Sequence, residues 1–276
     1  MEWNGMECRV IHLLFISIYT ILLRTSMTYD IYSDYVGFIC AAKKLGGFKS
    51  NPSYTYMLEH VSKQQGQSYL ECIFAETVIT KDEVVAFCAI NDANGSPQKE
   101  HYDALPVNVS VSPSSLRYIY HAHLILEHMK SMGDGAGGDM VELGGGYGGL
   151  CLAVHHFAPS YGICIRSYTI CDLTNIIQLQ KLYLNAVKPE LKVEFVDAST
   201  YGATITHDKM FLISNYCFSE IAGSHQALYR QLLFPKIANG FMVWNCIPVY
   251  DLGVGNLRVE PEIPLTGAEF NRYVWF

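Results

Sequence analysis

The sequence predicts an α/β protein: a Rossmann-like, seven-stranded, mostly parallel sheet with a helical extension at its N-terminus. Two patterns indicate this fold class. After residue 133, short apolar runs alternate with helix-length segments, whereas the chain before that point carries helical patterns. A glycine-rich turn also follows directly behind the first apolar run. Half of the 276 residues are hydrophobic and 16% are charged, so the chain can bury a sizeable core.

Three segments follow from these patterns. Residues 1–27 are expected to be a hydrophobic leader or helix, 28–132 a helical lid or substrate side, and 133–276 the ligand-binding Rossmann-like domain. Residues 10–23 are nearly all apolar, but they are short for a membrane span and lack the positive charges that begin a signal peptide. A buried or surface helix, a leader and a weak membrane anchor all remain open for this stretch.

Seven strands are expected in the Rossmann-like domain. They correspond to residues 139–143, 167–171, 191–196, 210–214, 240–244, 257–260 and 272–276. Strands that alternate with helices form a parallel sheet covered on both faces, and the last two strands read as a closing hairpin.

The N-terminal region contains two proline-marked helix starts. Asn51 precedes Pro52 and predicts a helix that runs to about Gln65, and Ser112 precedes a proline in a helix that ends near Met132. The polar stretch 92–103 contains glycine and proline and reads as a loop.

Charge and cysteine content limit the function classes. The formal net charge is −7 and no basic run is present, which argues against a protein that grips nucleic acid. The nine cysteines are scattered and form no C-x-x-C pair, so we expect a reducing, cytoplasmic compartment rather than a disulfide framework or zinc site. No Asp/His cluster has metal-ligand spacing, and no metal is expected.

The segment Glu142-Leu-Gly-Gly-Gly-Tyr-Gly148 joins the first strand to the following helix. Glycine is needed where the backbone takes positive φ or approaches a ligand closely. Ligands of open α/β sheets bind beyond the carboxyl ends of the strands, where this turn lies. We therefore expect ligand contacts from Glu142, Gly144, Gly145, Gly146, Tyr147 and Gly148.

The glycine turn permits more than one ligand. Gly144, Gly146 and Gly149 also satisfy the G-x-G-x-x-G pattern of NAD and FAD enzymes, and a plain packing turn is a further alternative. Glu142 favours S-adenosyl-L-methionine, because a carboxylate two residues before the first glycine can attract the α-ammonium of that cofactor. The same carboxylate would repel a pyrophosphate.

Acidic residues end the second and third predicted strands. Asp172, followed by Leu173, can accept hydrogen bonds from ribose hydroxyls, although it can equally cap the next helix. Asp197 and Ala198 are candidates for contacts with adenine, with a solvated strand-end acid as the alternative.

The fourth strand ends at Asn215 and Tyr216, where a methyl donor and its acceptor would meet. Both are candidate hydrogen-bond partners in catalysis, and Asn215 is also a candidate cofactor contact or helix cap. Glu220 and His225 are the candidate general bases. Enzymes that methylate nucleobase amines often carry Asn-Pro-Pro-Tyr here, so the absence of proline weakens a nucleobase acceptor.

Several phrases together resemble the sugar O-methyltransferase family, from about residue 35 to the end. The phrases that carry the resemblance are 48–54, 112–118, 141–149, 172–176, 179–184 and 214–220. The resemblance implies a seven-stranded Rossmann-like fold, S-adenosyl-L-methionine as cofactor, and methyl transfer to a hydroxyl of a small molecule or saccharide. It also implies cofactor contacts at Glu142, Gly144, Gly146 and Asp172.

Two departures from that family pattern stand out. Thr174 replaces a proline, and only residues 247–256 separate the fifth and sixth strands where a further helix is usual. The second departure keeps open a non-catalytic, cofactor-binding relative. An NAD(P)-dependent oxidoreductase is the other alternative.

Overall fold

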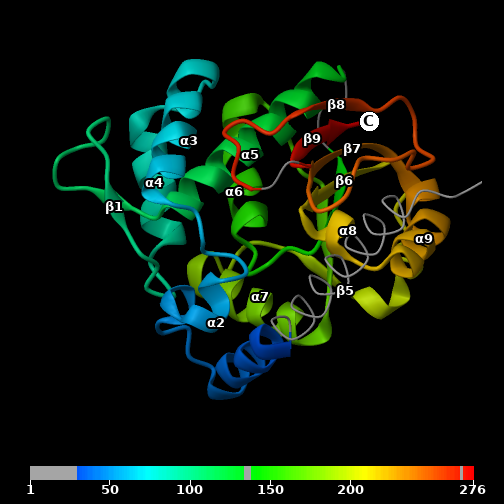
Figure 1. The fold of residues 1–276 in the computed structure, drawn as a ribbon, viewed down its shortest axis with the longest axis horizontal. Coiled ribbons are helices and arrows are strands. Elements are labelled where there is room, and N and C mark those ends of the chain that lie inside the picture. Colours follow the sequence, from blue (N-terminus) through cyan, green and yellow to red (C-terminus); the bar gives the residue numbers. More distant parts are fainter. Residues whose placement is uncertain (1–29, 134–137, 268–269) are drawn as a thin grey trace, which may run out of the picture.

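A seven-stranded sheet forms the centre of the chain in the computed structural model, which describes residues 30–133, 138–267 and 270–276 (Figure 1). The strand order is β5-β4-β3-β6-β7-β9-β8. Strand bounds are β3 Asp139–Leu143, β4 Ser167–Asp172, β5 Glu194–Asp197, β6 Met210–Asn215, β7 Ile237–Trp244, β8 Arg258–Pro261 and β9 Arg272–Trp275. The first five are mutually parallel, whereas β9 runs antiparallel to both β7 and β8. The predicted mostly parallel sheet of seven strands is therefore confirmed.

Helices cover both faces of the sheet. Alternate residues of a strand point to opposite faces. In β3, Met140 packs into the core under α5 (Pro113–Ser131), α6 (Gly149–Phe157) and α7 (Thr174–Val187). Its neighbour Val141 packs on the other face, where α8 (Cys217–Glu220) and α9 (Gly223–Leu232) lie.

The N-terminal region packs as a second helical layer. It contains a helix over residues 30–42, followed by η1 (Phe48–Ser50), α2 (Pro52–Thr55), α3 (Lys63–Glu76) and α4 (Lys81–Asn91). Helices α3 and α4 lie against α5 and α6, at the left of Figure 1. A small hairpin, β1 (Glu100–His101) with β2 (Ser110–Val111), follows, so the predicted loop at 92–103 contains one short strand.

The predicted helix from Pro52 to about Gln65 is wrong. Helix α2 ends at Thr55, and α3 starts only at Lys63. The reason is a capping box: the Gln65 N–H donates to Ser62 Oγ at 3.2 Å, and the Ser62 N–H donates to Gln65 Oε1 at 2.8 Å. This reciprocal pair fixes a new helix start, which an unbroken helix would not allow.

Other predicted boundaries agree closely with the structure. Helix α5 starts at Pro113 as predicted, β3 has the predicted bounds, and β5 begins at Glu194 instead of residue 191. No helix occurs between β7 and β8 within the described residues, as expected from the short connection. Residues 10–23 lie outside the described part of the chain. Among the helices that are described, none is long and apolar enough to cross a membrane.

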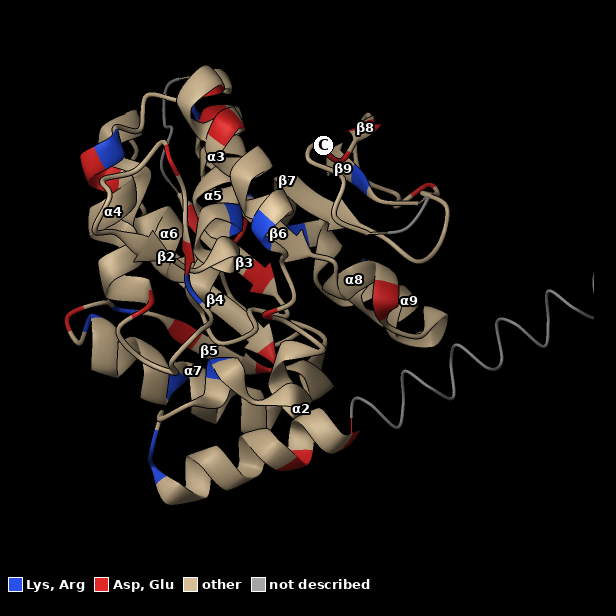
Figure 2. Cartoon of the chain, turned by 60° about the vertical axis from the view of Figure 1, so that its left-hand side comes forward, with Lys and Arg blue, Asp and Glu red and all other residues tan. Residues whose placement is uncertain are grey.

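A buried lysine ties the N-terminal region to the sheet. Lys49 is 1% exposed, and its Nζ donates to the Asn91 carbonyl at 2.6 Å. The same ammonium lies 4.0 Å from the centre of the Tyr147 ring and 4.6 Å from that of Tyr183, which gives cation–π contacts. Burial lowers the pKa of Lys49 to about 8. Charged residues of both signs are otherwise interspersed over the chain in the view of Figure 2.

Candidate functional site

The sheet has its topological switch point at β3. Successive strands go to one side of β3 as β4 and β5, and to the other side as β6 and β7. In open α/β sheets such a point leaves a crevice at the carboxyl ends of the strands, and ligands bind there. The segment 144–148, called the glycine loop below, leaves β3 at this position.

The backbone of the glycine loop depends on glycine. Gly144, Gly146 and Gly148 have φ values of +72°, +56° and +96°, in the left-handed region that other residues rarely adopt. A Cβ added to Gly144 would lie 2.4 Å from Cys217 Sγ, so the loop packs tightly against the start of α8. Gly146 is less confined: the nearest atom to such a Cβ is Leu58 Cδ1, at 3.4 Å.

Tyr147 points away from this loop into the core. Its side chain is 0% exposed, its hydroxyl accepts a hydrogen bond from Asn91 Nδ2 at 3.0 Å, and its ring packs 4.8 Å from that of Tyr183. In this conformation Tyr147 has only its backbone to offer to a ligand.

Glu142 lies beneath the glycine loop. The side chain is 1% exposed, and Oε2 accepts a hydrogen bond from the Tyr168 hydroxyl at 2.9 Å. A Cβ on Gly145 would lie 3.3 Å from the same oxygen. Burial raises the pKa of Glu142 to about 7, and the nearby Asp172 carboxylate contributes in the same direction. The Glu142 carboxyl is therefore separated from the surface of the site by the backbone of the loop.

Asp172 lies at the end of β4 and is tied to the glycine loop. It is 9% exposed; Oδ1 accepts from the Leu173 N–H at 2.8 Å and Oδ2 accepts from Gln180 Nε2 at 2.7 Å. The same Gln180 nitrogen lies 3.0 Å from the Gly146 carbonyl oxygen. Burial raises the pKa of Asp172 to about 6, against the effect of these hydrogen bonds.

Gln180 was not identified from the sequence. It is fully buried and sits on α7 between Ile176 and Leu184, which are also buried and lie one turn away on either side. The sequence could have indicated Gln180, because it is a single amide among the apolar residues on the buried face of this helix.

The end of β5 lies beside that of β4. Asp172 and Asp197 are paired in the sheet register. The Asp197 carboxylate accepts hydrogen bonds from the Ser199 N–H, at 2.9 Å, and from the Thr174 hydroxyl, and these bonds hold the pKa of Asp197 below its usual range. Ala198 is half-buried, and Leu173, which directly follows Asp172, is 40% exposed. The Leu173 side chain is therefore an exposed apolar surface beside the Asp172 carboxylate.

The end of β6 carries a buried polar cluster. Asn215 Nδ2 lies 2.8 Å from His121 Nδ1, although the two residues are 94 positions apart. The Tyr216 hydroxyl donates to Glu262 and lies 2.9 Å from Thr266 Oγ1, on the segment between β8 and β9. Three distant parts of the chain therefore meet at this strand end.

Two polar residues of α5 face this cluster, and both were missed from the sequence. Arg117 is 5% exposed, and Nη2 donates to the Leu58 carbonyl at 3.0 Å. His121 is 0% exposed and, in the described part of the chain, its Nε2 has no hydrogen-bond partner; the same holds for Asn215 Oδ1. The i, i+4 spacing of Arg117 and His121 puts both on one face of the helix, which was the available signal.

Glu220 and His225, the bases considered from sequence, lie elsewhere on the rim. Glu220 is exposed and accepts from Asn245 Nδ2 at 2.5 Å. His225 is also exposed; its ring stacks on Tyr201, and Nδ1 lies 2.8 Å from the Tyr201 hydroxyl. Neither side chain is hydrogen-bonded to Asn215 or Tyr216 in the described structure.

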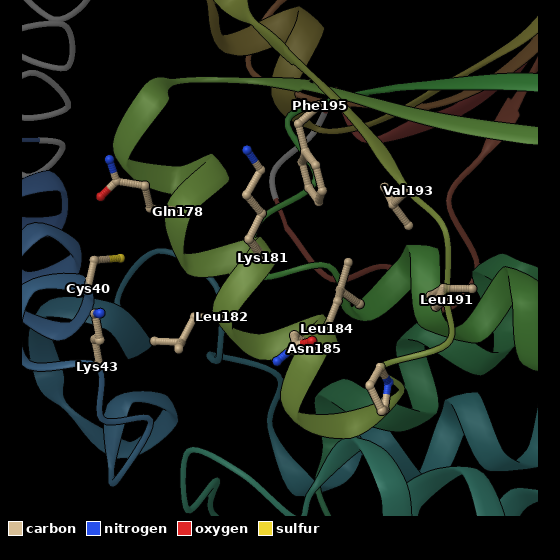
Figure 3. A pocket seen from close by; sticks show the side chains of 11 residues that line it. Cys40, Lys43, Gln178, Lys181, Leu182, Leu184, Asn185, Leu191, Val193 and Phe195 are labelled. Carbon is tan, nitrogen blue, oxygen red and sulfur yellow. The ribbon is translucent and has the colours of Figure 1, made fainter.

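A groove of about 670 Å³ lies at a different place, along α7 and the edge strand β5 (Figure 3). It is lined by Cys40, Lys43, Gln178, Lys181, Leu182, Leu184, Asn185, Pro189, Leu191, Val193 and Phe195. None of these residues belongs to the glycine loop. Among the described residues, no group of three His, Cys, Asp or Glu side chains is arranged to hold a metal ion.

Comparison with protein-family models and with curated proteins finds no match. Among solved structures, a candidate methyltransferase from Bacillus halodurans is 14% identical over 45% of this chain and 52% of its own, with a TM-score of 0.33. A candidate O-methyltransferase from Nostoc punctiforme is 7% identical over 59% of this chain and 60% of its own, with a TM-score of 0.40.

An amino pentose methyltransferase from Micromonospora echinaspora, solved with S-adenosylmethionine bound, is 8% identical over 52% of this chain and 57% of its own, with a TM-score of 0.37. The chain thus spans between 52% and 60% of the length of these three structures. The class of the fold is defined by the sheet itself: a Rossmann-like α/β sheet with an antiparallel β9 between β7 and β8.

Proposed function

We propose that this chain binds S-adenosyl-L-methionine and transfers its methyl group to a hydroxyl of a small-molecule acceptor, with saccharides as the acceptor class. One observation carries the proposal: a glycine loop at the switch point of the sheet has two buried carboxylates, Glu142 and Asp172, directly at its base. The Glu142 carboxyl beneath the loop favours a ligand with a cationic end, whose charge would in turn keep the carboxyl ionised, and it disfavours a pyrophosphate. The acceptor class rests on the resemblance to sugar O-methyltransferases.

The cofactor would lie across the ends of β3, β4 and β5. A carboxylate has about four acceptor positions, so Asp172 can accept from ribose hydroxyls in addition to its present partners. Leu173, Asp197 and Ala198 would line the adenine. The glycine loop would receive the amino-acid end, with the charge of Glu142 beneath it.

When bound, S-adenosyl-L-methionine supplies an activated methyl group; the residues of the chain must orient the acceptor and remove its proton. Orientation of the reacting groups contributes about 7–11 kcal/mol in well-aligned systems. We propose that Asn215 and Tyr216 help to orient the acceptor, because Asn215 ends β6, the strand paired with β3, and Tyr216 directly follows it. Residues 28–132 would form the acceptor side, since Leu58, Arg117 and His121 come from that region.

Three residues are candidates for the proton acceptor. Glu220 and His225 follow from the sequence, and His121 follows from its contact with Asn215. The geometry favours His121, because a proton acceptor needs an available lone pair and a partner that fixes its tautomer. A half-turn of the Asn215 amide lets its oxygen accept from Nδ1–H, which leaves the lone pair of Nε2 for the acceptor hydroxyl.

The second candidate function is binding without catalysis. The connection from β7 to β8 contains no helix in the described residues, so the acceptor side has less secondary structure at this edge. A non-catalytic relative would bind the cofactor and transfer nothing. The oxidoreductase alternative is disfavoured by Glu142, whose negative charge beneath the glycine loop would repel the pyrophosphate of NAD(P). Asp172 does not separate the two cofactors, because both contain a ribose.

The buried charge of Glu142 predicts a pH-dependent gain from Glu142→Gln. The carboxyl pKa rises from 4.5 to about 7 on folding, so the native state binds more protons than the unfolded state between these values. The buried carboxyl therefore lowers the free energy of unfolding as pH rises from about 4.5 to 7, and this loss of stability reaches its full value above pH 7. The variant, which can still accept from Tyr168, should gain on the order of 2 kcal/mol in unfolding free energy at pH 8 and much less at pH 5.

Urea unfolding of both proteins at the two pH values measures this gain. An equal gain at pH 5 and pH 8 would show that Glu142 does not carry a raised pKa.

Transfer of a labelled methyl group tests the proposed reaction. The full chain is incubated with radiolabelled S-adenosyl-L-methionine and panels of saccharides, phenols and amines. Product from the saccharides, with formation of S-adenosylhomocysteine, supports the proposal. Cofactor binding with no transfer to any panel favours the non-catalytic alternative.

A further inference from the structure

Arg117 is a buried cation without an ion-pair partner in the described chain. It lies on α5, is 5% exposed, and has no Asp or Glu oxygen within 4 Å among the described residues. Buried charges in proteins are usually paired, since removing an ion from water costs several kcal/mol. Glu59 interacts electrostatically with Arg117 but lies beyond ion-pair distance. Its Oε2 accepts from the Ser112 hydroxyl at 3.4 Å, and its buried Oε1 has no partner in the described chain.

The immediate neighbours of Arg117 are neutral. Its guanidinium carbon lies 5.6 Å from the centre of the Tyr118 ring and 5.8 Å from that of Tyr216, and Nη2 donates to the Leu58 carbonyl. Burial raises the pKa of Tyr118 to about 12 and that of Tyr216 well above its usual range. A guanidinium has five N–H donors, so the Leu58 carbonyl, the Tyr118 hydroxyl and two ring faces leave donors for another partner.

The position of Arg117 relates it to the glycine loop. The carbonyl of Leu58 accepts a hydrogen bond from the guanidinium, and the Leu58 side chain is the group nearest to the position that a Cβ on Gly146 would take. Tyr216, on the other side, directly follows β6 and precedes α8. The cation is therefore held between the glycine loop and the end of the strand beside it.

A second observation points to a ligand at the same place. His121, one helical turn from Arg117, and Asn215 each carry a buried polar atom without a partner in the described chain. Buried polar groups in native proteins are almost always paired, with protein, water or ligand. An unpaired cation beside two unpaired polar atoms indicates that part of this site is completed by a bound molecule.

We propose that Arg117 binds the α-carboxylate of the cofactor's methionine part, which deepens the proposed function and rests on it. An amino-acid end carries an ammonium and a carboxylate. The chain presents a negative charge beneath the glycine loop, at Glu142, and a positive charge beside Leu58, at Arg117. A guanidinium can hold a carboxylate through two parallel N–H···O bonds. An acidic group on the acceptor has the same chemistry and is the competing source of the anion.

Calorimetric titration of the full chain with two probes tests this assignment. S-adenosylhomocysteine carries the amino-acid end, and 5′-methylthioadenosine has the same nucleoside and thioether without it. Arg117→Gln should weaken S-adenosylhomocysteine binding by about 10- to 100-fold. Its affinity for 5′-methylthioadenosine should stay within about twofold of wild type. Arg117→Lys keeps the positive charge but not the two parallel N–H donors of the guanidinium. Its affinity for S-adenosylhomocysteine should therefore lie between those of wild type and Arg117→Gln.

Arg166→Gln is the matched control. Arg166 is exposed and pairs with Asp139 at the opposite end of β3, 3.0 Å away, so both affinities should remain unchanged. If Arg117→Gln does not fold, the ratio of the two affinities in Arg117→Lys gives the same readout.

Three results would overturn the assignment. Equal weakening of both probes would make Arg117 a structural residue. Unchanged S-adenosylhomocysteine binding, together with a raised KM for acidic acceptors only, would assign the anion to the acceptor. Failure of folded wild type to bind either probe would instead contradict the proposed cofactor itself.

Discussion

Asp172→Ala is expected to weaken S-adenosylhomocysteine binding by at least about tenfold, and up to about 100-fold or more. Asp172 would lose charge-assisted hydrogen bonds to the ribose, each worth about 1.5–3 kcal/mol. The substitution also removes the partner of Gln180 Nε2, which connects β4 to the Gly146 carbonyl. Both losses act at the proposed cofactor site.

Titration calorimetry of the variant measures this effect. Asp208→Ala is the control, because Asp208 is exposed and precedes β6 at the far end of the strand. Gln180→Ala should give a smaller loss of affinity. The Asp172 carboxylate remains in this variant, but the side chain that bridges it to the Gly146 carbonyl is removed. An Asp172→Ala protein with wild-type affinity would show that the end of β4 does not hold the ribose.

His121→Gln should lower kcat by about 10²–10⁴-fold while cofactor affinity stays near that of wild type. Glutamine keeps the approximate volume and a polar end but cannot accept the proton. Burial and the Arg117 charge keep the pKa of His121 well below its usual value, so the imidazole is neutral at neutral pH and has a free lone pair, although it is a weaker base than an exposed histidine. The contact with Asn215 brings this group to the end of β6.

Glu220→Ala and His225→Ala provide the direct comparison. Both side chains are exposed and are bonded to Asn245 and Tyr201 respectively, so each variant should retain most of the turnover. Initial rates are compared at saturating cofactor, and thermal unfolding shows whether His121→Gln is folded. Full activity in His121→Gln with loss in Glu220→Ala or His225→Ala would return the role to the residues chosen from sequence.

The sequence was informative where structure is set by local pattern. The bounds of β3 and the positive φ values in the glycine loop follow from neighbouring residues, namely a short, mostly apolar run and then glycines. The start of α5 follows from Ser112 before Pro113. The break between α2 and α3 was readable in principle, since the capping box of Ser62 and Gln65 is local, but the proline start at Pro52 suggested one longer helix.

The composition of the candidate site depended on contacts that no local pattern contains. Asn215 meets His121 across 94 positions, and Arg117 meets Leu58 across 59. Tyr147 shows the opposite case. Its place in the motif indicated a ligand contact, whereas an aromatic cluster around Lys49 holds its side chain in the core. Packing between the helical region and the sheet therefore decides which motif side chains remain available.

Titration calorimetry of the purified full chain shows whether it binds S-adenosyl-L-methionine. S-adenosyl-L-methionine and S-adenosylhomocysteine are titrated in parallel with NADH under the same conditions. We expect the first two to bind with a Kd of about 1 μM, near −8 kcal/mol, and NADH to give no heat of binding. A folded protein that binds NADH, or that binds neither S-adenosyl compound, would contradict this expectation.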